Sequence, residues 1–136
     1  MAEFSGECLC GAVSWSSDGP VTRSLVCHCH DCQRATSSPF TAFIGLHSGS
    51  LKWYGKINHY ESSAGSYRGF CPKCGMRLYF RSDTWPSEVH IHAARLDGGQ
   101  TYRPTAQVVT RSRATWLDEL ADIPAHDSFH QPPKES

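Results

Sequence analysis

Cys71-Pro72-Lys73-Cys74-Gly75 has the form of a zinc knuckle. Its two intervening residues make a tight turn that brings both sulfurs within reach of one cation, and Gly75 can take the positive φ needed next. A knuckle supplies two of the four thiolates that close a tetrahedral zinc site, so the rest of the chain must provide a second pair.

Cys8-Leu9-Cys10-Gly11 is the matching pair, with a similar trailing glycine. Residues two apart in an extended segment share a face, so both sulfurs can point at one cation. We therefore predict that Cys8, Cys10, Cys71 and Cys74 hold a structural Zn²⁺ that ties the N-terminus to the middle of the chain and adds folding free energy. The alternative is exposed or redox-active thiols.

Cys27-His28-Cys29-His30-Asp31-Cys32 contains the other three of the seven cysteines. Three thiolates leave one position on zinc open and give the complex a net charge of −1, which makes it a weak Lewis acid and a poor source of hydroxide. An incoming thiol suits that position better, because zinc would hold it as a thiolate. The pattern predicts a second, catalytic Zn²⁺ on Cys27, Cys29 and Cys32, and chemistry that makes or breaks a carbon–sulfur bond.

Two neighbouring features leave alternatives open at this cluster. A histidine could close the site as a second structural zinc; His28 should point to the opposite face of an extended segment, and His30 is better placed. Either could instead donate to a ligand or shuttle protons. Arg34 could meet a substrate carboxylate or offset the negative charge, or could be a solvated surface residue.

Short β-branched and aromatic runs, separated by Gly, Ser, Asn and Pro, predict an all-β fold of short strands with little helix. The only helical signal lies at residues 115–120, where Thr115 could cap a turn. We expect one zinc-binding domain over residues 1–123 and a flexible tail over 124–136. The expected strands are 12–16, 21–26, 40–46, 51–54, 57–61, 66–70, 76–80, 89–93 and 106–110.

His90-Ile91-His92 resembles a metal-binding pair, but we expect a half-buried strand with Val89 and Ile91 inward and both histidines toward solvent. The tryptophans, tyrosines and phenylalanines occur at strand spacing, which favours core positions over a substrate cleft.

The charge balance limits the partners. The 136 residues include 13 basic and 13 acidic side chains, and the pI is near 7.1, so no strong field attracts nucleic acid or an anionic membrane surface. The first residues lack a signal-peptide pattern, and no apolar run approaches the length of a membrane span. We expect a cytoplasmic protein, where close-set cysteines favour metal ligation over disulfides.

With these residues in view, the chain resembles the glutathione-dependent formaldehyde-activating enzyme family, which includes centromere protein V. The resemblance runs from residue 6 to residue 97 and rests on the ordered set of three cysteine clusters. The matching stretches are residues 6–13, 27–35, 38–40, 65–66, 68–75 and 96–97.

The resemblance implies a β-tent fold similar to that of Rab exchange-factor accessory proteins. It also implies a structural zinc on Cys8, Cys10, Cys71 and Cys74 and a catalytic zinc on Cys27, Cys29 and Cys32. The implied activity is a carbon–sulfur lyase that joins glutathione to formaldehyde as S-hydroxymethylglutathione. A non-catalytic, zinc-stabilised interaction module is the main alternative, and redox sensing or metal buffering by the three-cysteine cluster is another.

Overall fold

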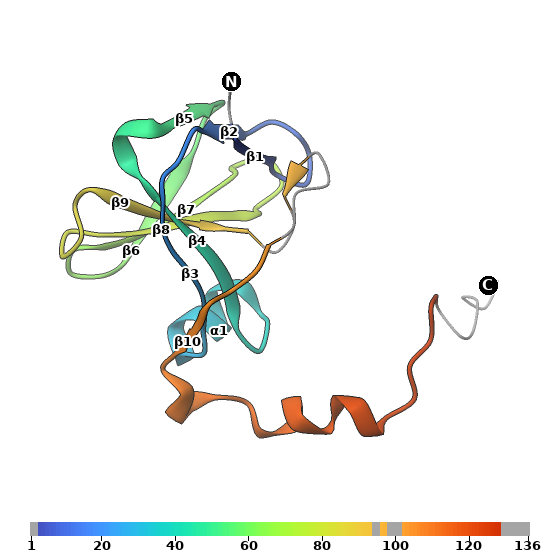
Figure 1. Ribbon diagram of the computed structural model, residues 1–136. Helices are drawn as coiled ribbons and strands as arrows, with labels where there is room; N and C mark the ends of the chain where they lie inside the picture. Colours follow the sequence, from blue (N-terminus) through green and yellow to red (C-terminus); the bar gives the residue numbers. More distant parts are fainter. Residues whose placement is uncertain (1–2, 94–95, 98–101, 129–136) are drawn as a thin grey trace.

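The computed structural model describes residues 3–93, 96–97 and 102–128, and these form two β-sheets (Figure 1). The smaller sheet has the strand order β1-β2-β5, and the larger has the order β10-β3-β4-β9-β8-β7-β6. The prediction of an all-β fold is confirmed. The strands are β1 (Phe4–Glu7), β2 (Ser14–Ser17), β3 (Val21–Cys27), β4 (Thr41–His47), β5 (Leu51–Tyr54), β6 (Asn58–Ser63), β7 (Ser66–Phe70), β8 (Arg77–Ser82), β9 (Glu88–His92) and β10 (Ala106–Val108).

Strand pairing in the two sheets is antiparallel with one exception among the described strands. Neighbouring strands in both sheets pair antiparallel, except that β10 runs parallel to β3 and returns the C-terminal segment to the end of the strand that carries Cys27. The expected strands at 51–54 and 66–70 have the observed bounds. Strand β1 was not expected; it pairs with β2 and carries the chain toward Cys8.

Helical structure is short. The helical segments whose bounds lie within the described residues are α1 (His30–Thr36), η1 (Ser48–Ser50), η3 (Thr110–Ser112) and η4 (Thr115–Asp122). The turn expected at 115–120 is present as 3₁₀ helix, but the expected cap is wrong, because Ala114 is the N-cap and no side chain caps it. Helix α1 was not expected. None of the described helices has the length and hydropathy required to cross a membrane.

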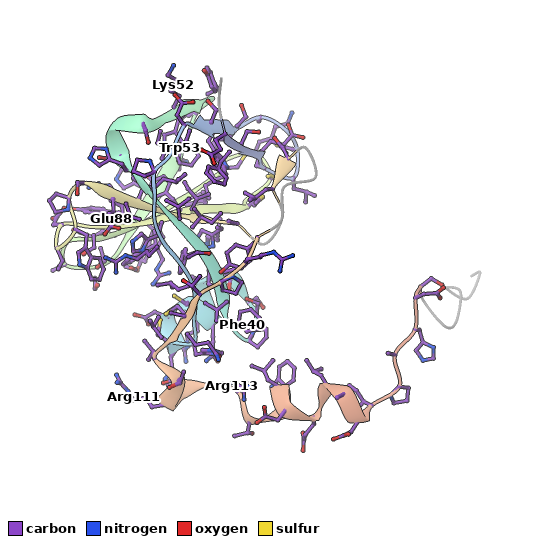
Figure 2. All side chains as sticks on the ribbon, viewed as in Figure 1. Phe40, Lys52, Trp53, Glu88, Arg111 and Arg113 are labelled. Carbon is purple, nitrogen blue, oxygen red and sulfur yellow. The ribbon has the colours of Figure 1, made fainter. Side chains whose placement is uncertain are left out.

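The main core lies where the sheets meet. Trp15, Leu46 and Ile91 are buried there. Trp53, which is labelled in Figure 2, packs against this cluster and also against a second one around Cys8 and Cys71. The aromatic residues divide between core and surface. Trp15 and Phe43 are buried, whereas Tyr54, Tyr60, Trp85 and Trp116 are exposed.

The expected orientation of the β9 histidines is wrong. His90 is 7% exposed, and the ring of His92 lies 4.9 Å from that of Phe43. The reason is that β9 lies inside the larger sheet and is covered on both faces, with Val89 and Ile91 on one core and the histidines against aromatic rings on the other. Burial, with the charges of Arg68 and Arg77, lowers the pKa of His92 to about 3, so the ring is neutral near pH 7.

After β10 the chain leaves the sheets as an extended arm that carries η3 and η4 (Figure 1). The expected flexible tail, 124–136, falls partly outside the described residues and stays a prediction.

Candidate metal centres

The structure brings Cys8, Cys10, Cys71 and Cys74 together, with all four sulfurs within 4.8 Å of one another. Cys8 and Cys10 follow β1, and Cys71 and Cys74 lie in the turn between β7 and β8. The Sγ atoms of Cys8 and Cys10 are 3.7 Å apart, and those of Cys10 and Cys71 are 3.8 Å apart.

The two pairs have similar backbone geometry. The N–H of Gly11 donates to the carbonyl of Cys8 at 3.0 Å, and the N–H of Gly75 donates to the carbonyl of Cys71 at 2.8 Å. Both glycines have positive φ, +79° and +76° respectively, which other residues adopt only at a cost. Backbone N–H groups also point at the sulfurs, from Val13 to Cys8 and from Cys74 to Cys71.

This donor set fits zinc. Tetrahedral Zn–S bonds of about 2.3 Å place sulfurs about 3.8 Å apart, close to the observed separations. The same separations are far longer than the S–S bond of about 2.05 Å in a disulfide, and all seven cysteines are free. The four cysteines could therefore hold a closed, structural metal.

Cys27, Cys29 and Cys32 form a second cluster, also with sulfurs within 4.8 Å of one another. Cys27 ends β3, Cys29 is the N-cap of α1, and Cys32 lies in the first turn of that helix. The Sγ of Cys29 accepts a hydrogen bond from the N–H of Cys32 at 3.2 Å, so a ligand sulfur also starts the helix. Among the described residues, no fourth Cys, His, Asp or Glu joins the cluster.

Neither neighbouring histidine completes this cluster. His28 is 1% exposed, bonds through Nε2 to Oε1 of Gln107 at 2.9 Å, and packs against the ring of Phe40. His30 is exposed on the outer side of α1. Gln33 fixes the loop instead, because its Nε2 donates to the carbonyl oxygens of His28 at 2.6 Å and Ser112 at 2.9 Å.

The three thiols are linked electrostatically. A hydrogen bond with Cys32 lowers the pKa of Cys27, and the same bond together with burial raises the pKa of Cys32. Burial raises the pKa of Cys29. Three thiolates at this spacing need a cation to be stable together near pH 7, as the donor set of a metal site does.

Arg68 adds the nearby positive charge, and sequence reasoning missed it. Its Nη1 donates to the Sγ of Cys32 at 3.9 Å, its Nε donates to the Oγ of Ser62 at 3.2 Å, and its guanidinium lies 5.0 Å from the ring centre of Phe80. Arg68 is only 6% exposed. The sequence did hold a signal for Arg68, because it lies in an expected strand that runs directly into Cys71. A cation buried in such a strand requires a partner.

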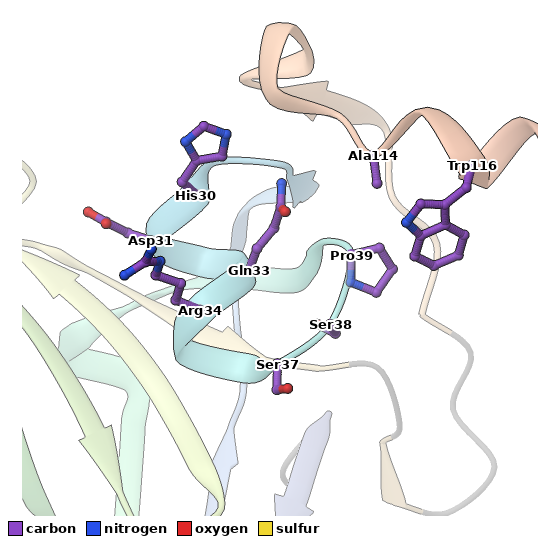
Figure 3. Close-up of a pocket in the computed structure, with 9 residues that line it drawn as sticks. All are labelled: His30, Asp31, Gln33, Arg34, Ser37, Ser38, Pro39, Ala114 and Trp116. Carbon is purple, nitrogen blue, oxygen red and sulfur yellow. The ribbon is translucent and has the colours of Figure 1, made fainter.

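Two of the hollows beside α1 are lined by charged residues of that helix. The larger, about 1010 Å³, lies between the helix and the arm, where Arg34 and Asp31 project from α1 and Trp116 lies opposite Pro39 (Figure 3). The smaller hollow, about 260 Å³, is the one next to the three-cysteine cluster, because Arg68 lines it and also contacts Cys32. Arg34 borders both. We call the smaller hollow the arginine pocket; its polar lining is Asp31, Arg34, Tyr60, Ser62, Arg68 and Arg77.

Comparisons with known proteins identify a family and relatives in sequence and in structure. Residues 3–112 match the family model described as glutathione-dependent formaldehyde-activating enzyme. An uncharacterized lyase of Schizosaccharomyces pombe is 32% identical over 108 residues, which cover 79% of each chain. A crystal structure of a Rhodobacter sphaeroides protein matches with a TM-score of 0.62 at 20% identity, over 76% of this chain and 98% of that one, and supports the fold alone.

Proposed function

The chain belongs to the glutathione-dependent formaldehyde-activating enzyme family, and from that premise we propose that it is a zinc-dependent carbon–sulfur lyase acting on a small thiol adduct. The lyase name of the yeast relative supports an enzyme of this kind. The observation that carries the proposal is the three-cysteine cluster, whose sulfurs lie within 4.8 Å of one another without a fourth ligand among the described residues.

Cys27, Cys29 and Cys32 would hold the catalytic zinc, and Cys8, Cys10, Cys71 and Cys74 the structural one. When bound to the three-cysteine cluster, zinc supplies a site that lowers the pKa of a substrate thiol. Arg68 offsets the negative charge of the cluster from a distance of 3.9 Å, so that a further anionic sulfur can approach. All seven cysteines are free, which fits a reducing compartment such as the cytoplasm.

The reaction we propose needs no oxidant or reductant. In the glutathione and formaldehyde version, the thiol sulfur forms a bond to the carbonyl carbon, the carbon–oxygen π bond breaks, and the oxygen takes up a proton in place of the one lost from sulfur. The reverse reaction breaks the same carbon–sulfur bond.

The test is the exchange rate between glutathione, formaldehyde and S-hydroxymethylglutathione, measured by NMR with and without zinc-loaded protein. We expect acceleration above the uncatalysed rate, and we expect Cys29→Ser to return the rate to background while the fold remains. Cys74→Ser should instead reduce metal content and stability together. Full turnover in the Cys29→Ser variant would contradict the assignment.

One observation favours a second candidate, a zinc-stabilised interaction module. The arm exposes Trp116, Leu120 and Ile123, which are 49%, 49% and 55% exposed. Such a module would bind two closed metals and no small thiol. The absorption spectrum of protein with cobalt in place of zinc distinguishes the two candidates. If adding glutathione changes the absorption of one of the two cobalt ions, the enzyme is supported. If the spectrum stays unchanged, the module is supported.

A further inference from the structure

The arginine pocket holds positive charge that lacks a carboxylate partner in the described part of the chain. Arg34 comes from α1, Arg68 from β7 and Arg77 from β8. Asp31 is the acidic group in the lining, and no ion pair among the described residues includes any of the three arginines. Guanidinium groups gathered around a hollow in this way are suitable donors for carboxylates.

The arm carries the opposite charge. Residues 1–114 contain 12 Lys and Arg against 8 Asp and Glu, whereas residues 115–128 contain 4 Asp and Glu and neither Lys nor Arg. Glu119 and Asp122 are exposed, and the ion pairs of the described residues include neither of them. They lie three residues apart in the 3₁₀ helix η4, so their carboxylates share one face of it. The arm thus presents a pair of unpaired carboxylates.

These carboxylates lie away from the arginine pocket of their own chain. The start of the arm is held beside α1, because Nε2 of Gln33 donates to the carbonyl oxygen of Ser112 at 2.9 Å and Arg113 pairs with Asp118 at 3.1 Å. Beyond this point the arm runs away from both sheets (Figure 1). No described residue of the arm lines the arginine pocket. The two complementary surfaces of one chain therefore remain apart.

A second copy of the same chain offers the matching partner for both surfaces. Its arm carries the carboxylates that the pocket lacks, and its pocket carries the guanidinium groups that the arm lacks. When a two-fold axis relates the copies, the contact occurs twice and leaves neither surface unmatched. Leu120 and Ile123 flank the carboxylates and are 49% and 55% exposed, while Tyr60 lines the pocket and is 61% exposed. Burial of these apolar surfaces would add to the attraction between the charges.

We propose that the arm of a second copy docks on the arginine pocket, with its two unpaired carboxylates facing Arg34 and Arg77, and that the contact is reciprocal in a two-fold dimer. Arg68 lines the same pocket and also contacts the three-cysteine cluster. The second copy thus contributes side chains next to that cluster. The dimer contact is independent of the reaction at the cluster, and its test measures molecular mass rather than activity.

Sedimentation equilibrium of the zinc-loaded, full-length protein tests this contact. We expect a mass of twice 15.1 kDa, and we expect the dimer to dissociate as the salt concentration rises, because salt screens exposed charges. Reversing the arm charges with Glu119→Arg and Asp122→Arg together should raise the dimer dissociation constant roughly tenfold or more. Reversing the pocket charges with Arg34→Glu and Arg77→Glu together should do the same. Mixing the two double variants should restore the dimer, since a basic arm then meets an acidic pocket and an acidic arm meets a basic pocket.

Arg81→Glu is the matched control, since Arg81 lies on the same strand as Arg77 but pairs with Asp83 outside the pocket. This variant should change the dissociation constant by no more than about twofold. Arg34→Glu alone, at an exposed helix position, replaces the pocket variant if the substitution at Arg77 prevents folding.

Three results would overturn the inference. The first is a single chain at every concentration up to about 1 mM, where even a weak contact would be populated. The second is a dimer that survives both charge reversals. The third is loss of the dimer in both double variants without recovery on mixing, because the arm and the pocket would then not contact each other.

Discussion

Arg68 is a buried cation whose nearest negative partner would be the Cys32 thiolate, with Nη1 3.9 Å from the sulfur. Removing the charge should make three clustered thiolates harder to form. We predict that Arg68→Gln lowers zinc affinity at the three-cysteine cluster roughly tenfold, the amount a charge-assisted hydrogen bond contributes. Competition with a colorimetric chelator measures this, with Arg81→Gln as the control. Unchanged affinity would mean that Arg68 only fills space.

Gly75 and Gly55 differ in what a side chain would meet. Both have positive φ, +76° and +98°, but a Cβ on Gly75 would have no atom within 4 Å, whereas one on Gly55 would lie 2.1 Å from the carbonyl oxygen of Ala12. We predict that Gly75→Ala costs about 1 kcal/mol of unfolding free energy, from backbone strain alone. Gly55→Ala should cost several times more. Urea unfolding at saturating zinc measures both, and equal losses would count against the backbone geometry.

Single residues also show where sequence reasoning succeeds. The trailing glycines at positions 11 and 75 mark the positive φ of each knuckle, because that conformation is a local property of the turn. The orientation of His90 and His92 is not local. Alternation predicts which residues share a face, and it does so correctly here, but the number of covered faces depends on where β9 lies in the sheet.

At the scale of elements, β9 and β3 are joined across β4 by an ion pair. Arg23 donates through Nε and Nη2 to the two carboxylate oxygens of Glu88, at 3.2 and 3.1 Å. Burial alone would raise the pKa of Glu88, but the Thr22 hydroxyl and the Arg23 charge outweigh it, so the pKa lies below 4.5. His90 lies 4.0 Å from the same carboxylate, and burial lowers the pKa of His90. On the neighbouring strand β4, the exposed residue His47 lies opposite Glu88 in the strand register.

A depressed carboxylate pKa contributes stability above the unfolded-state pKa and loses it as the pH falls through the folded-state value. We predict that Glu88→Gln lowers the unfolding free energy by on the order of 1 kcal/mol at pH 7, and that this difference shrinks below about pH 4.5. Comparing variant and parent at each pH cancels the acid release of metal that both share. A difference that stays constant from pH 7 to pH 3 would contradict this account.

Helix α1 shows why element prediction failed at the three-cysteine cluster. The helix has seven residues and lacks an apolar periodicity, so its sequence does not indicate a helix. What the sequence does indicate is a metal site, through the spacing of its cysteines. It begins because the Cys29 sulfur accepts the N–H of Cys32, and it ends at Ser37 in a left-handed conformation. The same sulfur therefore serves the cluster and the helix, a dual role that spacing alone does not reveal.

At the scale of the whole molecule, the division of cysteines into four and three could be predicted because the cysteines fall in three short local groups, two of which are pairs followed by a glycine. The arginine pocket could not, since its lining comes from α1, β6, β7 and β8, which only the folded sheet brings together. Arg34, the one member that sequence reasoning selected, lies next to a cysteine cluster. Arg68 and Arg77 lie on neighbouring strands across a turn that was interpreted only as a zinc knuckle.

The four-cysteine centre joins the two sheets. Two of its ligands, Cys8 and Cys71, belong to a small buried cluster with Val13 and Leu78. This cluster is distinct from the main core around Ile91, although Trp53 and Tyr79 pack against both. Without metal, four thiols less than 4.8 Å apart would lose their shared cation, and the small cluster would weaken first.

We therefore predict that a zinc chelator causes amide hydrogen exchange to rise in β1 and in the Cys71–Cys74 turn before it rises in β4 and β9. The larger sheet keeps the Ile44, Leu46 and Ile91 core when the metal is gone, so its amides should remain protected at chelator concentrations that expose β1. Cys29→Ser separates the two centres, because it alters only the three-cysteine cluster and should leave β1 protected while zinc is bound elsewhere. If exchange rises equally in both sheets, the four-cysteine centre stabilises the molecule as a single unit, and the two sheets do not differ in stability once the metal is removed.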